Sequence, residues 1–304
     1  MHRDSRSGRT MGATTMIAAA LTAITMTHAA AHPRTPRPAY HLQAALEVDD
    51  EPLIAEPIRL NVDLSGQFMH GDIDGVVQVP KGGRTGTSSP DRPTLDELGF
   101  DDVSIVDVSA SLQWERHIFD SGGRFVRLDG SATLRTDLIT HAVTFPARTL
   151  VSADLQFDWY RLGYRYEFLF DPDEHGNRLS FAPGIDVVLF DFDYELRGGG
   201  DFHANRDYLK AGVRVGGVGR WLTSGPISIE GSAFWGLPFD GTAQIFSLEL
   251  VGKYRLWGGK SATSGSLYLG VAYDEIEYED DQGFPNRVDV DMGPLFIAGM
   301  KITF

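Results

Sequence analysis

The most regular feature of the sequence is an alternation of apolar and polar residues with a period of two. In the stretch from Ile58 to Met69, apolar residues hold the even positions from 58 to 64, and polar residues hold the odd positions from 59 to 67. Successive side chains of a β-strand point to opposite faces, so a period of two is the period of a strand. The pattern therefore predicts a chain built from strands.

The same alternation recurs along the rest of the sequence. We expect strands at residues 58–69, 106–114, 126–135, 149–170, 180–195, 207–221, 227–237, 242–256, 266–278 and 288–304. Turn-forming residues, such as Gly198-Gly199-Gly200 and Asp240-Gly241, separate several of these segments. The sequence therefore predicts an all-β protein with strands joined in series.

The last segment ends on an aromatic residue. Its apolar alternate positions are Phe296, Ala298, Met300, Ile302 and Phe304. This pattern resembles the C-terminal assembly signal of Gram-negative outer-membrane β-barrel proteins, which end on Phe after alternating apolar residues. The resemblance implies an antiparallel up-and-down transmembrane barrel in the outer membrane. It also implies outer-membrane lipid and the barrel-assembly machinery as partners.

The resemblance also bears on strand number. The segment 149–170 changes parity near Leu162-Gly163, which indicates either a β-bulge or a tight turn. A bulge gives ten strands and a turn gives eleven, and single-chain bacterial barrels have an even number. We therefore expect a bulge and about ten strands, with eight or twelve as alternatives.

The first predicted hairpin has a definite register. Asp120-Ser121-Gly122 is a turn-like sequence between the segments 106–114 and 126–135. Aligning opposite charges then sets Glu115 opposite Arg127 and Asp107 opposite Arg135. We expect these charges to face the barrel interior.

A soluble, lipocalin-like barrel would show the same alternation. The residues of the polar face must therefore distinguish a soluble barrel from a membrane barrel. Small residues such as Ser109, Ser111 and Gly216 occur on it, and they suit a confined interior better than a water-facing wall. Aromatic residues of the apolar face suit a girdle at the membrane borders. The girdle residues that we expect are Trp114, Trp159, Trp221, Trp235, Tyr254 and Tyr273.

The N-terminal region differs from the rest. Residues 1–31 combine a basic start, an apolar run from Ala13 to Thr27, and small residues at 29–31, which predicts a cleaved secretory signal peptide. Residues 32–56 are rich in proline without a sustained period, and we expect a flexible periplasmic leader. The barrel would then occupy residues 57–304.

Composition removes several classes of function. The chain has no cysteine, which excludes disulfides and thiolate metal sites. Its 27 basic residues against 42 acidic residues give a formal charge of −15, which argues against nucleic acid as a partner. The sequence does not predict an oligomeric state.

Charges of both signs lie at polar positions of the expected strands. We expect a network of ion pairs in the lumen, formed by Asp107, Glu115, Arg127, Asp129, Arg135, Asp154, Asp158, Lys210 and Arg214. A narrow interior filled in this way would be occluded. This favours an envelope structural or surface-interaction protein, with a narrow solute channel as an alternative.

An outer-membrane lipid or peptide hydrolase is the other alternative. His117 and His203 each have a carboxylate nearby in the sequence, but no known catalytic motif surrounds either one. We expect neither to lie beside a hydroxyl nucleophile or a carboxylate, and we assign no catalytic residue, cofactor or metal site. Residues 95–100 are expected to form a short loop helix, with a plug of the barrel mouth as the alternative.

Overall fold

The computed structural model describes residues 60–78, 94–140, 143–200, 202–258, 263–279 and 287–304. The predicted signal peptide (1–31) and leader (32–56) lie outside the described residues. The wall strands are β1 (Leu60–Gln78), β2 (Asp102–Trp114), β3 (His117–Thr133), β6 (Leu150–Tyr166), β8 (Arg178–Gly198), β9 (His203–Leu222), β10 (Ile227–Gly236), β11 (Gln244–Trp257), β12 (Ser264–Glu279) and β13 (Arg287–Thr303). Shorter elements are η2 (Asp96–Leu98), β4 (Leu138–Thr140), β5 (Val143–Phe145) and β7 (Phe168–Leu169), which continues β6 along β8.

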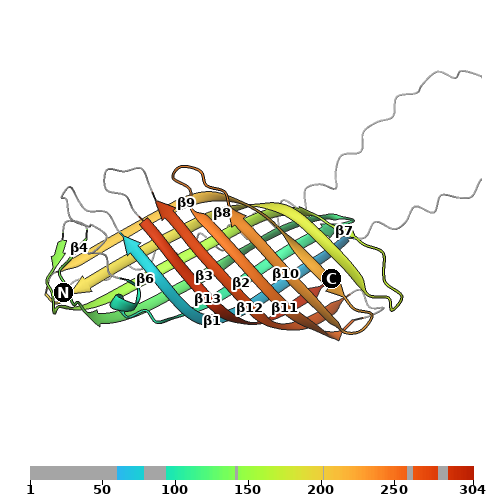
Figure 1. Ribbon diagram of the computed structural model, residues 1–304, viewed down its shortest axis with the longest axis horizontal. Helices are drawn as coiled ribbons and strands as arrows, with labels where there is room; N and C mark the ends of the chain where they lie inside the picture. Colours follow the sequence, from blue (N-terminus) through green and yellow to red (C-terminus); the bar gives the residue numbers. More distant parts are fainter. Residues whose placement is uncertain (1–59, 79–93, 141–142, 201, 259–262, 280–286) are drawn as a thin grey trace, which may run out of the picture. The chain divides into compact units, whose positions relative to one another are not determined.

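The ten wall strands close into a barrel. Each pairs antiparallel with its neighbours in chain order, β6 pairs with β8, and β1 pairs with both β2 and β13. Among the described strands, closure leaves no free edge in the sheet that forms the wall. The predicted all-β, ten-stranded antiparallel barrel is therefore confirmed (Figure 1).

The two ends of the barrel differ. The end that carries β4, β5 and η2, at the left of Figure 1, is called here the loop end. The other end carries the start of β1, the end of β13 and a two-residue turn, Glu115-Arg116, between β2 and β3. It is called here the turn end.

The expected register of the first hairpin is wrong. Trp114 pairs with His117 across the Glu115-Arg116 turn, and Asp107 therefore lies opposite Arg124. Glu115 has a φ of 56°, so the turn uses a left-handed residue that is not glycine. Asp120, Ser121 and Gly122 lie within β3 instead. Gly122 is needed there because a Cβ would meet Val108 O at 2.8 Å and the Arg161 guanidinium at 3.0 Å.

The expected bulge at Leu162-Gly163 is also wrong. The pairings of β6 with β3 and with β8 run through Gly163 without a register shift. A bulge occurs instead in β13, where the pairing with both β1 and β12 shifts between Met292 and Leu295. Side chains of β6 therefore alternate between the inner and the outer face without interruption. The apolar residues change from one face to the other because the surroundings of the two faces change along the strand.

That change occurs on β1 as well. Toward the turn end, Leu64 and Phe68 are exposed on the outer face, and Asp63 and Gln67 point inward. Toward the loop end, the inward positions are apolar, as at Met69 and Ile73, and the outward ones are polar. The outward residues there include His70, Asp72 and Asp74.

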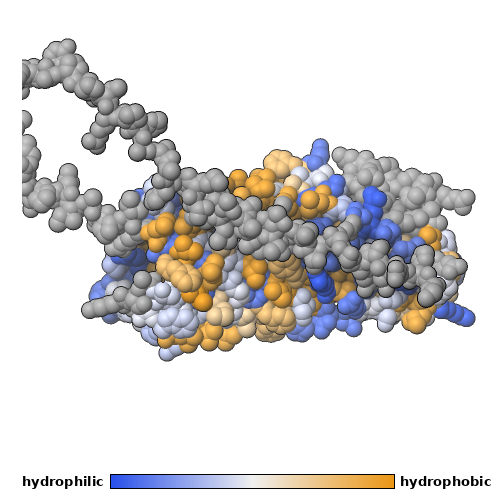
Figure 2. Space-filling view, turned by 180° about the vertical axis from the view of Figure 1, so that it is seen from behind, coloured by the Kyte–Doolittle hydropathy of each residue, from blue (hydrophilic) through white to orange (hydrophobic). Residues whose placement is uncertain are grey.

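The same reversal recurs on the neighbouring strands. When each strand is followed from the turn end, one inward-facing polar residue is the last before the reversal. These residues are Asp107 in β2, Arg124 in β3, Arg161 in β6, Asp186 in β8 and Asp274 in β12. The turn-end half thus has an apolar outer wall and a polar interior, and the loop-end half has the opposite arrangement. Figure 2 shows a broad apolar area over the middle of one wall, with hydrophilic residues more frequent toward the loop end, at its right.

Candidate functional site: the interior of the barrel

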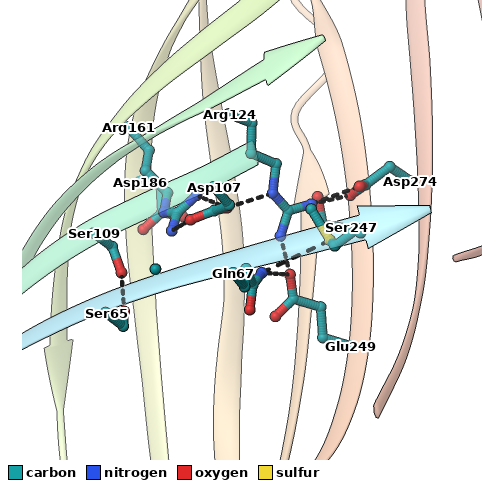
Figure 3. A network of polar contacts seen from close by, with 12 residues as sticks. Ser65, Gln67, Asp107, Ser109, Arg124, Arg161, Asp186, Ser247, Glu249 and Asp274 are labelled. Carbon is teal, nitrogen blue, oxygen red and sulfur yellow. Dashed lines mark hydrogen bonds and ion pairs between the residues drawn. The ribbon is translucent and has the colours of Figure 1, made fainter. Parts of the chain in front are cut away.

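A layer of buried ion pairs crosses the interior at the level of the reversal. Arg124 Nε lies 2.6 Å from Asp107 Oδ2, and Arg124 Nη1 lies 2.5 Å from Asp274 Oδ2. Arg124 also pairs with Glu249, and Arg161 donates to both oxygens of Asp107 at 2.8 and 3.0 Å. Arg124, Asp107 and Asp274 are 4%, 3% and 0% exposed, so each charge depends on its partners (Figure 3).

Glycine at 163 makes room for this ionic layer. A Cβ there would meet Asp186 Oδ1 at 2.3 Å and Asp120 Oδ2 at 2.9 Å. These two carboxylates pair with Arg214 and Arg165, each at 2.7 Å. The glycine that suggested a bulge in the sequence therefore serves close packing of charges.

Below this layer, toward the turn end, the polar interior is hollow. Arg220 pairs with Glu230 at 2.8 Å, Lys253 pairs with Glu230 at 2.9 Å, and Lys301 pairs with Asp63 at 2.5 Å. A cavity of about 150 Å³ lies among these groups and Ser65, Ser109 and Tyr268. Its size and polarity suit a few ordered waters, which take about 30 Å³ each.

Above the layer, toward the loop end, aromatic and aliphatic side chains fill the interior. Trp159, Phe157, Phe190 and Phe192 are fully buried, and they belong to one core with residues of β12 and β13. The Arg124 guanidinium lies over the Trp159 ring, 5.6 Å from its centroid. The ionic layer therefore abuts an apolar core directly.

The loop end of this core is capped. Thr94 and Glu97 form a reciprocal capping box, with both side-chain-to-backbone bonds at 3.2 Å, which fixes the short helix η2. Leu95, Leu98 and Phe100 from this segment are at most 2% exposed. Residues 95–100 thus contain the expected short helix, and its buried neighbours pack at the loop end of the core, as the plug alternative also implies.

The expected luminal residues separate into groups. Asp107 and Arg214 lie in the ionic layer, and Lys210 lies over the Tyr278 ring at 5.2 Å. The other expected residues are elsewhere: Glu115 is in the turn, Arg135 is exposed after β3, and Arg127, Asp129, Asp154 and Asp158 have the outward parity of the loop-end half. Their inward orientation is wrong because polarity reverses along these strands.

The outward charges form their own contacts. Asp129 lies opposite Asp154, and Arg197 bridges Asp154 at 3.3 Å and Glu195 at 2.5 Å. Partial burial and a hydrogen bond with Asp129 raise the pKa of Asp154. Partial burial opposes the ionised form of Glu195, but hydrogen bonds from Arg197 and His203 outweigh it and lower the pKa of Glu195.

Five of the six expected girdle residues face outward. Trp114, Trp221 and Tyr254 are exposed near the turn end. Trp235 and Tyr273 flank Phe246 near the reversal, with ring centroids 5.4 and 6.2 Å away. Trp159 is wrong as a girdle residue, because it is buried in the interior.

The histidines have partners, contrary to expectation. His117 Nδ1 lies 2.9 Å from the Tyr164 hydroxyl, and His203 Nε2 lies 2.7 Å from Glu195. His70, which no sequence motif marks, also has a partner, because its Nδ1 lies 3.2 Å from Ser104 Oγ. Its Nε2 is 3.9 Å from Asp102, beyond hydrogen-bond length, so no connected Ser-His-Asp series forms.

Two further features of the described residues bear on their chemistry and on how the chain could cross a membrane. Among them, no set of three or more His, Cys, Asp or Glu residues is arranged to hold a metal ion. In the same part of the chain, no helix is long and apolar enough to cross a membrane.

The fold is a closed ten-stranded antiparallel barrel whose interior is polar in one half and apolar in the other. No protein-family model and no curated protein match the sequence. Among solved structures, the crystal structure of a Pseudomonas aeruginosa FadL homologue is similar, with 9% identity and a TM-score of 0.30. That match covers 81% of this chain and 90% of the other. No subfamily follows from it.

Proposed function

We propose that the protein is a non-conducting outer-membrane barrel whose loop-end half projects from the membrane as a water-facing surface. The observation that carries this proposal is the reversal of polarity along the wall. Exposed apolar residues such as Phe68, Leu269 and Phe296 would be unfavourable in water, and lipid is the solvent that suits them. A strand-built span must close on itself, because lipid offers no partner to backbone amides.

The lengths of the strands support the proposal that the loop-end half projects from the membrane. β8 and β9 contain 21 and 20 residues, and a tilted strand needs about 9–11 to cross the bilayer. In β1 the outward apolar residues run from Leu60 to Phe68, which is close to that length. The remaining residues of the strands carry outward charges, which suit water beyond the membrane.

The interior argues against the channel alternative. A conducting path would need continuous polar space, but the loop-end half is filled by a packed apolar core and capped by η2. We therefore favour an envelope structural or surface-interaction role. The turn end would face the periplasm, because such barrels have short periplasmic turns.

Planar bilayer recording tests the closed lumen. Protein purified in its folded form should insert and show no sustained current steps. Steady large openings from the wild-type protein would contradict the proposal. Insertion is scored independently, by the different electrophoretic mobility of heated and unheated protein.

A further inference from the structure

An apolar groove crosses the outer wall of the turn-end half. Its volume is about 950 Å³, and it extends over six neighbouring strands, from β2 through β1, β13, β12 and β11 to β10. Its lining combines small outward residues, Gly66, Ala298 and Gly252, which are called here the floor, with bulky apolar residues such as Phe68, Leu269 and Met300.

The strand register defines the course of the groove. One row of outward residues is Val106, Phe68, Ala298, Leu269 and Gly252, and the next is Val108, Gly66, Met300, Leu267, Tyr254 and Ile227. The rows begin beside Ser104, at the reversal, and end at the first residue of β10. Six strands spaced by about 4.8 Å give a length of about 24 Å. The groove therefore crosses the apolar band from one border to the other.

The barrel itself does not require the small floor residues. A Cβ at Gly66 would meet nothing within 4 Å, and at Gly252 the nearest atom is 4.0 Å away. Glycine weakens a strand through its larger loss of chain entropy and its lack of a side chain to pack. The neighbouring outward residues Phe68 and Leu269 are 49% and 69% exposed, so bulky residues are compatible with this wall.

We propose that this groove holds one acyl chain of a glycerophospholipid, with the phosphate at the turn end. The inference rests on the membrane location proposed above. Charge supports the orientation, because Asp72, Asp102 and Asp74 lie beyond the groove at the reversal and would repel a phosphate. At the turn end, Tyr254 has a hydroxyl. Arg255 has the inward parity of Lys253, but it is exposed at the end of β11 and donates a 2.8 Å bond to Gly225 O of the neighbouring turn.

A second copy of the chain suits the groove less well. A two-fold dimer places the same surface against itself, so two concave grooves would face each other and enclose a void. A flexible acyl chain can instead follow the curved floor and fill it.

Leucine substitutions at two outward glycines test the proposal. Gly66→Leu fills the floor, and Gly219→Leu is the matched control, because a Cβ at Gly219 also meets nothing within 4 Å and the residue is outside the groove. Each protein is purified in mild detergent with phosphatidylglycerol added, and retained lipid is measured by native mass spectrometry. Wild type and Gly219→Leu should retain one phospholipid. Gly66→Leu should lose at least about tenfold in affinity, the change that corresponds to 1.4 kcal/mol.

The orientation is tested by charge variants. Arg255→Gln should weaken retention of phosphatidylglycerol, and Asp102→Asn should leave it unchanged. A reversed result would overturn the proposed direction of the lipid.

Several outcomes would overturn the groove itself: equal retention by Gly66→Leu, a bound second copy of the chain, or a wild type without retained phospholipid. These failures are distinct from failure of the proposed function. If wild-type protein inserts into phosphatidylglycerol vesicles and shows heat-dependent mobility but retains no lipid, only the groove inference fails. If it does not insert, the membrane location fails.

Discussion

The turn-end half and the loop-end half of the barrel share the same strands but place opposite kinds of side chain inside. In the turn-end half, Asp63 and Lys301 form an internal ion pair, and Phe68 is exposed outside. In the loop-end half, Phe157 is buried inside, and Asp154 faces outward. The pairing of the strands is thus continuous through both halves, although the polarity of their two faces is opposite.

The two interiors are also stabilised differently. The loop-end core resembles that of a water-soluble protein, where each buried large apolar side chain contributes about 1.5–3 kcal/mol. The turn-end interior depends on charges that have lost water and must find partners within the barrel. Substitutions in the two halves should therefore change the stability of the barrel by different amounts.

The largest effect is expected in the ionic layer. Arg124→Ala removes the cation shared by Asp107, Glu249 and Asp274 and should destabilise the barrel by about 3–5 kcal/mol. Urea unfolding in detergent micelles, followed by electrophoretic mobility, measures this change. The control is Arg127→Ala on the outer face, which should change stability by less than about 0.5 kcal/mol. Similar losses in both variants would contradict the assignment of Arg124 as the internal cation.

A slightly smaller effect is expected in the loop-end core. Phe157 is fully buried, and Phe157→Ala should leave a cavity that costs about 3–4 kcal/mol. Phe68→Ala is the comparison in the turn-end half, where lipid can fill the space left by the side chain. The same unfolding assay should show a clearly larger loss for Phe157→Ala, and equal losses would argue against a packed core.

The next largest effect is expected when a charge is introduced on the outer wall, because its cost should differ between the two halves. Leu269→Arg places a cation toward lipid and should cost about 2–4 kcal/mol if it lies near the bilayer midplane. Asn205→Arg, on the outer face of the loop-end half, should be nearly neutral. Folding yield into vesicles measures both, and a tolerated Leu269→Arg would contradict the lipid-facing band.

The smallest effect concerns pH. The pKa of Glu195 is lowered in the folded protein, so its contribution is present above the unfolded-state pKa and is lost as the pH falls through the folded pKa. The pair is partly exposed, which limits its value to about 0.2–1 kcal/mol. Glu195→Gln should therefore reduce the loss of stability on acidification, measured by unfolding at a series of pH values. An identical pH profile would contradict this role of Glu195.

The strands were predictable from the sequence because the period of two survives in both halves. Their even number and the closed barrel followed from the resemblance to outer-membrane barrels, although the bulge expected at Leu162-Gly163 is absent. The sequence was insufficient for the interior, because the inverted halves have the same period. In β6, Trp159 and Tyr164 belong to apolar runs of opposite parity, and this was interpreted as a bulge. A reversal of environment explains it without any irregularity in the strand.

The turn of the first hairpin was missed for a related reason. Asp120, Ser121 and Gly122 are common in turns, but here they lie within β3, where Asp120 pairs with Arg165 in the polar interior and Gly122 gives room to Arg161. The actual turn, Glu115-Arg116, has no glycine or asparagine. Local propensity was thus overridden by contacts between distant strands, and the ion pairs expected from the wrong register did not form.

The central claim is that polarity reverses where the barrel leaves the membrane, and cysteine labelling on intact cells tests it most directly. The chain has no native cysteine, so single substitutions are unambiguous. The account predicts that a membrane-impermeant maleimide labels Asn205→Cys but not Ala204→Cys, its inward neighbour, or Leu269→Cys in the lipid-facing band. Glu174→Cys, in the turn between β7 and β8, should react only after the outer membrane is permeabilised. Labelling of Leu269→Cys together with protection of Asn205→Cys on cells with folded protein would contradict the account.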